Sequence, residues 1–93
     1  MTTKRAIKMK SGETVPAGAK VSPSETHTLA LVHGAERTYR VKYQNLGLKI
    51  PSELTLMRWS DDGIAKSVNG KKTEPDGIDA DGFPSWLLAL GLI

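Results

Sequence analysis

The chain has 93 residues, enough for one small domain with a thin core. Its 39% hydrophobic and 25% charged residues exclude a wholly disordered protein, and the absence of cysteine excludes a disulfide framework and a thiolate metal site. The N-terminus lacks the apolar stretch of a signal peptide, and the final apolar run, residues 86–93, is far shorter than the ~20 residues that span a bilayer. We therefore expect a single cytoplasmic domain without a membrane partner.

Charge is distributed unevenly along this chain. Residues 1–72 hold all 13 Lys and Arg against six acidic residues, whereas residues 73–93 hold four acidic residues and no basic one. A basic body followed by an acidic segment is typical of a protein with a polyanionic partner, of an internal electrostatic contact, or of both.

The N-terminal segment has the alternation of a strand. Ile7 and Met9 are predicted to point inward, and Lys8 and Lys10 to point outward. The next segment, residues 11–25, contains Gly and Pro at intervals that exclude a helix, so we expect a loop.

Residues 27–43 predict a β-hairpin with a turn at residues 33–36. In its second strand, alternation places Tyr39, Val41 and Tyr43 on one face and Thr38, Arg40 and Lys42 on the other. The register of the first strand depends on the turn length. The residues that share the Tyr39 face are therefore either Leu29 and Leu31, or Ala30 and Val32.

After Gly47 the sequence favours helices. Pro51 and Ser52 are typical of a helix start, Glu53 suits the first turn, and Gly63 predicts the end of the helix. Residues 64–72 predict a possible strand with a turn at Asn69-Gly70.

The last segment, "FPSWLLALGLI", repeats the device of an apolar residue before Pro and Ser and then leucines. We predict a short helix that packs back onto the strands, because a domain this small needs these apolar side chains in its core. They are Phe83, Trp86, Leu87, Leu88, Leu90, Leu92 and Ile93. The alternative is a docking peptide, acidic and then apolar, that inserts into a groove of a partner protein.

Strands followed by helices make an α+β protein. The stretch "TVPAGAKVS … LALVHGAERTYRVKY" resembles small SH3-like β-barrels over about residues 5–50, a resemblance that implies a barrel followed by a helical part, residues 51–93. The whole chain also resembles small uncharacterised proteins of bacteriophages and mobile elements that end in a tail of the "PSWLLALGLI" type.

The sequence does not predict an enzyme, a metal site or a cofactor. Asp76, Asp79 and Asp81 precede a glycine, but the remaining ligands of an EF-hand loop are missing, so we interpret them as turn and helix-start residues. His27 and His33 are more typical of a strand end and a turn than of a zinc site. No Ser lies in a nucleophile motif, and "VNGKK" lacks the spacing of a phosphate-binding loop.

Basic residues are the strongest functional signal. If the apolar positions of the two strands face inward, their cations form an outer surface suited to phosphate contacts, with Lys4 and Arg5 nearby. The residues predicted to bind nucleic acid are Lys8, Lys10, Arg40, Lys42, Lys71 and Lys72. Outward lysines can also serve solubility alone, and we expect most aromatic side chains to be used in the core.

Two functions are predicted. The first is a small, non-enzymatic accessory protein that binds DNA or RNA, and the resemblance to SH3-like barrels implies that a sheet face and loops make the contacts. The alternative is a protein-interaction module that binds or blocks a host protein without nucleic acid. In either case we expect a monomer or a weak homodimer.

Overall fold

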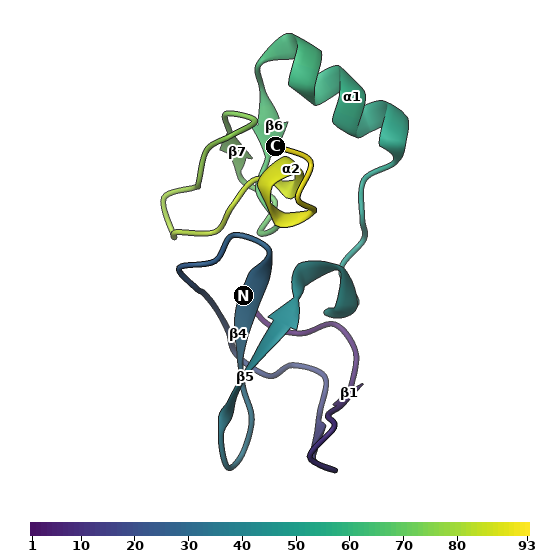
Figure 1. Cartoon of the computed structure of the whole chain (residues 1–93), viewed down its shortest axis with the longest axis vertical. Helices are drawn as coiled ribbons and strands as arrows, with labels where there is room; N and C mark the ends of the chain where they lie inside the picture. The colour runs from purple at the N-terminus through teal and green to yellow at the C-terminus, as the bar shows by residue number, and fades with distance from the viewer.

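Five short strands occupy residues 1–50 of the computed structural model, which describes all residues from 1 to 93 (Figure 1). They form one two-stranded and one three-stranded antiparallel sheet, and a short 3₁₀ helix follows the last strand. The elements of this N-terminal half are β1 (Ile7–Lys8), β2 (Thr14–Val15), β3 (Val21–Pro23), β4 (Leu29–His33), β5 (Thr38–Lys42) and η1 (Tyr43–Asn45).

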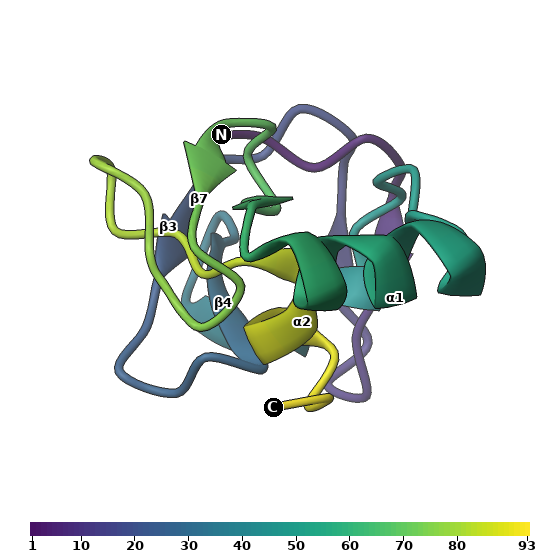
Figure 2. The ribbon, with the colours of Figure 1, turned by 90° about the horizontal axis from the view of Figure 1, so that it is seen from above.

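The C-terminal half, residues 51–93, contains both α-helices and a third antiparallel pair of strands. Figure 1 shows α1 at the top of the molecule and the C-terminal helix α2 between α1 and the N-terminal sheets, while Figure 2 shows α1 and α2 side by side. The elements of this half are α1 (Glu53–Asp62), β6 (Ala65–Lys66), β7 (Lys72–Thr73) and α2 (Trp86–Ala89).

The predicted α+β class, with strands before helices, is confirmed. The strands form three separate antiparallel sheets, in the orders β1-β2, β3-β4-β5 and β6-β7, and no closed barrel is present. The SH3-like barrel over residues 5–50 therefore stays a prediction. The molecule is elongated, with extents of 42 × 23 × 18 Å.

The register of the predicted hairpin is now defined. Val32 pairs with Tyr39 and Ala30 with Val41, so Ala30 and Val32 are the residues that share the inner face. Both are fully buried. Leu31 pairs with Arg40 and lies with it on the other face, where it is half-buried.

Helix α1 begins and ends as the sequence predicts. The Ser52 hydroxyl accepts a hydrogen bond from the Thr55 N–H at 3.2 Å, which satisfies one of the free donors of the first turn. At the other end Gly63 adopts a left-handed conformation, φ +72°, and its N–H bonds to the Trp59 carbonyl. A glycine makes that conformation without a steric cost.

The C-terminal segment forms the predicted helix, and its first residues are buried. The Ser85 hydroxyl accepts from the Leu88 N–H at 3.1 Å, and Trp86 and Leu87 are 5% and 3% exposed.

Two expectations about this segment need correction. Helix α2 packs chiefly against α1 and β6 rather than against the N-terminal strands, because the Val68 N–H and the Pro84 carbonyl tie its entry to the strand after α1.

The second correction concerns the last two residues, which are not part of the core. Leu92 and Ile93 are 58% and 59% exposed. The reason is the turn at Gly91, which has φ +73° and ends the helical segment, so that the two side chains after it project into solvent.

Asp79 organises the acidic loop that leads into α2. Its carboxylate is buried and accepts the Ser67 hydroxyl at 2.6 Å and the backbone N–H groups of Asp81 and Phe83 at 2.8 and 3.0 Å. These donors supply the hydrogen bonds that a buried polar side chain requires. The loop is therefore held to the residue that follows β6.

A single hydrophobic core of fifteen buried residues extends through both halves. Tyr43 and Leu46 of the N-terminal half are fully buried in it. The Tyr43 hydroxyl is the one buried side-chain polar group without a hydrogen-bond partner. Burial raises the pKa of Tyr43 to about 12, and the negative charge of Asp79 adds to this shift.

The burial of Trp86 predicts that the C-terminal segment is required for folding. Trp86→Ala should lower the free energy of unfolding by ~3–5 kcal/mol, as measured by chemical unfolding followed by circular dichroism. Leu92→Ala is the matched control and should change it by less than about 0.5 kcal/mol, because Leu92 is exposed. A chain of residues 1–83 that melts sharply at the wild-type midpoint would contradict this prediction.

The unpartnered Tyr43 hydroxyl predicts a stabilising substitution. Tyr43→Phe should raise the free energy of unfolding by about 1 kcal/mol, because it removes a buried polar group that makes no hydrogen bond. The gain should grow from pH 10 to pH 12, since the unfolded wild type ionises near pH 10 and the folded protein only near pH 12.

Tyr39→Phe is the control for this substitution. The Tyr39 hydroxyl donates to Glu13 Oε1 at 2.6 Å, so its removal should destabilise the protein at neutral pH. If Tyr43→Phe proves destabilising as well, the Tyr43 hydroxyl has a partner in solution. Urea unfolding of the three proteins at pH 8 and pH 11 distinguishes these outcomes.

Candidate functional site

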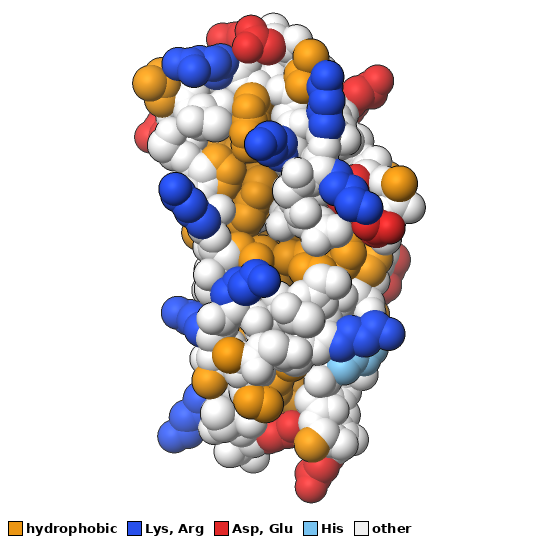
Figure 3. All heavy atoms as spheres, turned by 180° about the vertical axis from the view of Figure 1, so that it is seen from behind, with side chains coloured by type: hydrophobic (Ala, Val, Ile, Leu, Met, Phe, Trp, Pro, Cys, Tyr) orange, Lys and Arg blue, Asp and Glu red, His pale blue; other side chains and the backbone are white.

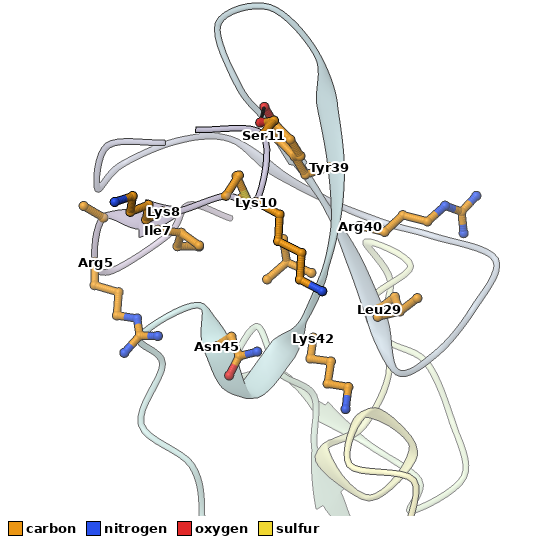
Figure 4. A pocket seen from close by; sticks show the side chains of 13 residues that line it. Arg5, Ile7, Lys8, Lys10, Ser11, Leu29, Tyr39, Arg40, Lys42 and Asn45 are labelled. Carbon is orange, nitrogen blue, oxygen red and sulfur yellow. Dashed lines mark hydrogen bonds between the residues drawn. The ribbon is translucent and has the colours of Figure 1, made fainter. Parts of the chain in front are cut away.

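The largest hollow of the molecule lies between β1 and β5, with a volume of about 770 Å³. Its lining comes from β1 and the residues on either side of it, β5, η1 and the first residue of β4, and includes no acidic residue. Five basic side chains line it, and we call this surface the basic hollow: Arg5, Lys8, Lys10, Arg40 and Lys42 (Figure 4).

The alternation of the two strands places these cations at the surface. Ile7 and Val41 are buried, and the lysines that follow them, Lys8 and Lys42, are exposed. The predicted inward and outward positions of Ile7, Lys8, Val41 and Lys42 are therefore confirmed. Met9 and Lys10 lie beyond the end of β1, where Met9 is half-buried and Lys10 is exposed. The cations do not share one sheet surface, however, because β1 pairs with β2 and β5 pairs with β4. They border a hollow between two sheets instead.

The five side chains take different directions around the hollow. Figure 4 shows Lys10 extending across it toward β5, Lys42 and Arg5 near Asn45, and Lys8 at the outer side of β1. Arg40 points away from the hollow and forms an ion pair with Glu25 at 2.6 Å. The pKa of the Glu25 carboxyl is lowered by a hydrogen bond from the backbone of Glu25 itself and by the contact with Arg40.

The other predicted site residues lie elsewhere. Lys71 is in the C-terminal half and forms an ion pair with Asp81, which raises the pKa of Lys71 and lowers the pKa of Asp81. Lys72 lies in β7 and lines a different hollow, beside Trp59. Four of the six predicted residues are thus brought together, and Lys71 and Lys72 are not among them.

Sequence reasoning missed a second surface, formed where residues 48–51, α1 and β6 meet. Two neighbouring hollows there have volumes of about 480 and 400 Å³ and share Trp59 and Lys66. Trp59 is half-buried rather than fully used in the core. The Asn69-Gly70 turn was a usable signal, because a turn there brings the segment with Lys66 back beside the segment with Lys72, and the two residues do pair in the structure.

The acidic loop has a structural role that the sequence only partly indicates. Asp79 accepts three hydrogen bonds from its own loop and Ser67, and Asp81 pairs with Lys71. The structure contains no group of three or more His, Asp or Glu side chains placed to hold a metal ion. The His33 ring bonds to the Ser22 hydroxyl at 2.9 Å, within the three-stranded sheet.

No family model, curated protein or solved structure matches this chain. None of its helices combines the length and the apolar character needed to cross a bilayer.

The bonding of Asp79 and Asp81 predicts that calcium does not stabilise the protein. Thermal melts in excess calcium and in chelator should coincide, because the oxygens of Asp79 and Asp81 already have protein partners. A site present only in the folded state would raise the melting temperature by mass action. A rise of several degrees with calcium would show that this interpretation of the loop is wrong.

Proposed function

We propose that this chain is a small, non-enzymatic accessory protein, encoded by a phage or mobile element, that binds nucleic acid through the basic hollow. The observation that carries the proposal is that five cations and no acidic residue line the largest hollow of the molecule. Such a surface suits the phosphate backbone, which proteins contact with Lys and Arg without reading the base sequence.

The contributions of the cations should differ. Lys10, Lys42, Lys8 and Arg5 belong to neither of the two ion pairs of the structure, so their charges are available to phosphates. Arg40 has Glu25 as a competing partner and should contribute less. Lys71 is neutralised by Asp81.

The resemblance of residues 5–50 to SH3-like barrels supports this use of strands and loops, since small barrels of that kind often bind partners in the same way. No arrangement of nucleophile, base and orienting acid suggests a reaction. The proposed partners are therefore DNA or RNA, bound without a cofactor.

A protein-interaction module is the second candidate, and apolar side chains on the surface favour it. Leu54 and Met57, one turn apart on α1, are 66% and 58% exposed. Exposed apolar groups at such spacing can dock against a partner protein. Neither side chain lines the hollows around Trp59, so such a docking surface would be separate from them.

The basic hollow predicts a charge-dependent affinity that two substitutions should reduce. Lys10→Gln with Lys42→Gln should weaken binding of a mixed-sequence oligonucleotide at low salt. The slope of log affinity against log salt concentration should flatten by about one to two units. Each lost phosphate contact reduces the magnitude of this slope by ~0.7–0.9, and two contacts are removed. Fluorescence anisotropy across a salt series measures both quantities.

The matched control is Lys4→Gln with Lys20→Gln, which removes the same charge from exposed residues that line none of the hollows described here. It should change the slope less. Arg40→Gln alone should have a small effect, because Arg40 is paired with Glu25. If the wild type binds no oligonucleotide at low salt, nucleic-acid binding is excluded and the protein-interaction module remains.

A further inference from the structure

An apolar furrow with basic sides runs along the C-terminal half (Figure 3). It consists of the two neighbouring hollows that meet at Trp59 and Lys66, and we call it the tryptophan furrow. Its apolar lining includes Leu48, Val68 and the edge of the buried Trp86. The volumes of about 480 and 400 Å³ are within the range of sites that hold small planar groups.

The charges of the furrow define the chemistry of its occupant. One acidic residue, Asp62, and four cations line it. The cations are Lys49, Arg58, Lys66 and Lys72. None of the four cations takes part in either ion pair of the structure. An apolar lining with an excess of unpaired positive charge at its sides is complementary to a ligand that combines an apolar face with negative charge.

Trp59 is the residue best placed to contact the apolar part of such a ligand. It lies in the last part of α1 and lines both hollows, whereas Leu56 of the same helix is buried in the core. Trp59 is half-buried, so part of its side chain is accessible from the furrow. Aromatic rings beside cations are the combination that single-stranded nucleic acids use, with bases stacked on the rings and phosphates held by the cations.

We propose that the tryptophan furrow binds a single-stranded segment of nucleic acid, with one base stacked on Trp59 and the neighbouring phosphates held by Lys49 and Lys66. The proposal rests on the proposed function and adds a preference for single strands over duplex. The preference follows from access, because the faces of the bases in a duplex are covered by their neighbours, whereas an open base offers its face to a ring.

The test compares short oligothymidine with a duplex of the same length, each bound to the wild type, Trp59→Ala and Trp59→Phe. Trp59→Ala should weaken binding of oligothymidine about tenfold, leave duplex binding unchanged and leave the salt slope unchanged, because stacking involves no counterion release. Trp59→Phe should have a smaller effect, since it keeps a ring. Oligothymidine should quench the tryptophan fluorescence of the wild type. Trp59→Phe should lose most of this quenching, because Trp86, which also lines the furrow, is only 5% exposed.

Lys10→Gln with Lys42→Gln separates this proposal from the proposed function. If Trp59→Ala binds oligothymidine as the wild type does while the lysine variant binds it weakly, the function stands and the furrow proposal is wrong. If Trp59→Ala loses single-stranded and duplex binding equally, the ring does not read open bases, and the proposal is also wrong. If the wild type binds neither probe, both proposals fail. Should Trp59→Ala not fold, Trp59→Phe and the quenching decide.

Discussion

Beyond the chain connection itself, the two halves of this molecule are held together by side-chain packing rather than by hydrogen bonds. None of its hydrogen bonds connects residues 1–50 with residues 51–93, and the shared core of fifteen residues carries the contact. Tyr43 and Leu46, from the N-terminal half, are fully buried. In the C-terminal half, Gly82 lies so close to Pro23 that a Cβ added to Gly82 would be 3.2 Å from the Pro23 ring. Because packing of this kind depends on close fit, a single lost side chain at the junction affects both halves.

The elements that local chemistry specifies were predictable. Ser52 and Gly63 define the ends of α1, the alternation around Val41 defines the outward cations, and Asn69-Gly70 defines the last hairpin. What local patterns do not contain is which strands pair. The alternation of β1 and β5 would look the same if the two strands were neighbours in one sheet. The pairing of β1 with β2 instead turns the expected basic sheet face into a hollow.

The second surface was missed for a related reason. A tryptophan in a short amphipathic helix of a small domain is normally a core residue, and Leu56 does take that role in α1. Whether Trp59 is covered depends on how residues 48–51 and β6 pack beside the helix, which is a tertiary property. Lys49 and Lys66, seventeen positions apart, come to the same furrow only through this packing.

The acidic C-terminal segment does not neutralise either basic surface. Asp79 is buried and its carboxyl group accepts hydrogen bonds from Ser67 and from its own loop, while Asp81 is paired with Lys71. None of the four acidic residues after Thr73 lines the basic hollow or the tryptophan furrow. Asp79 and Asp81 thus make their contacts within the C-terminal half rather than with the cations of the two surfaces. Apart from Arg40, which is paired with Glu25, the cations of the two surfaces take part in no ion pair. Their positive charge is left for an anionic partner, which is the electrostatic condition that both proposals require.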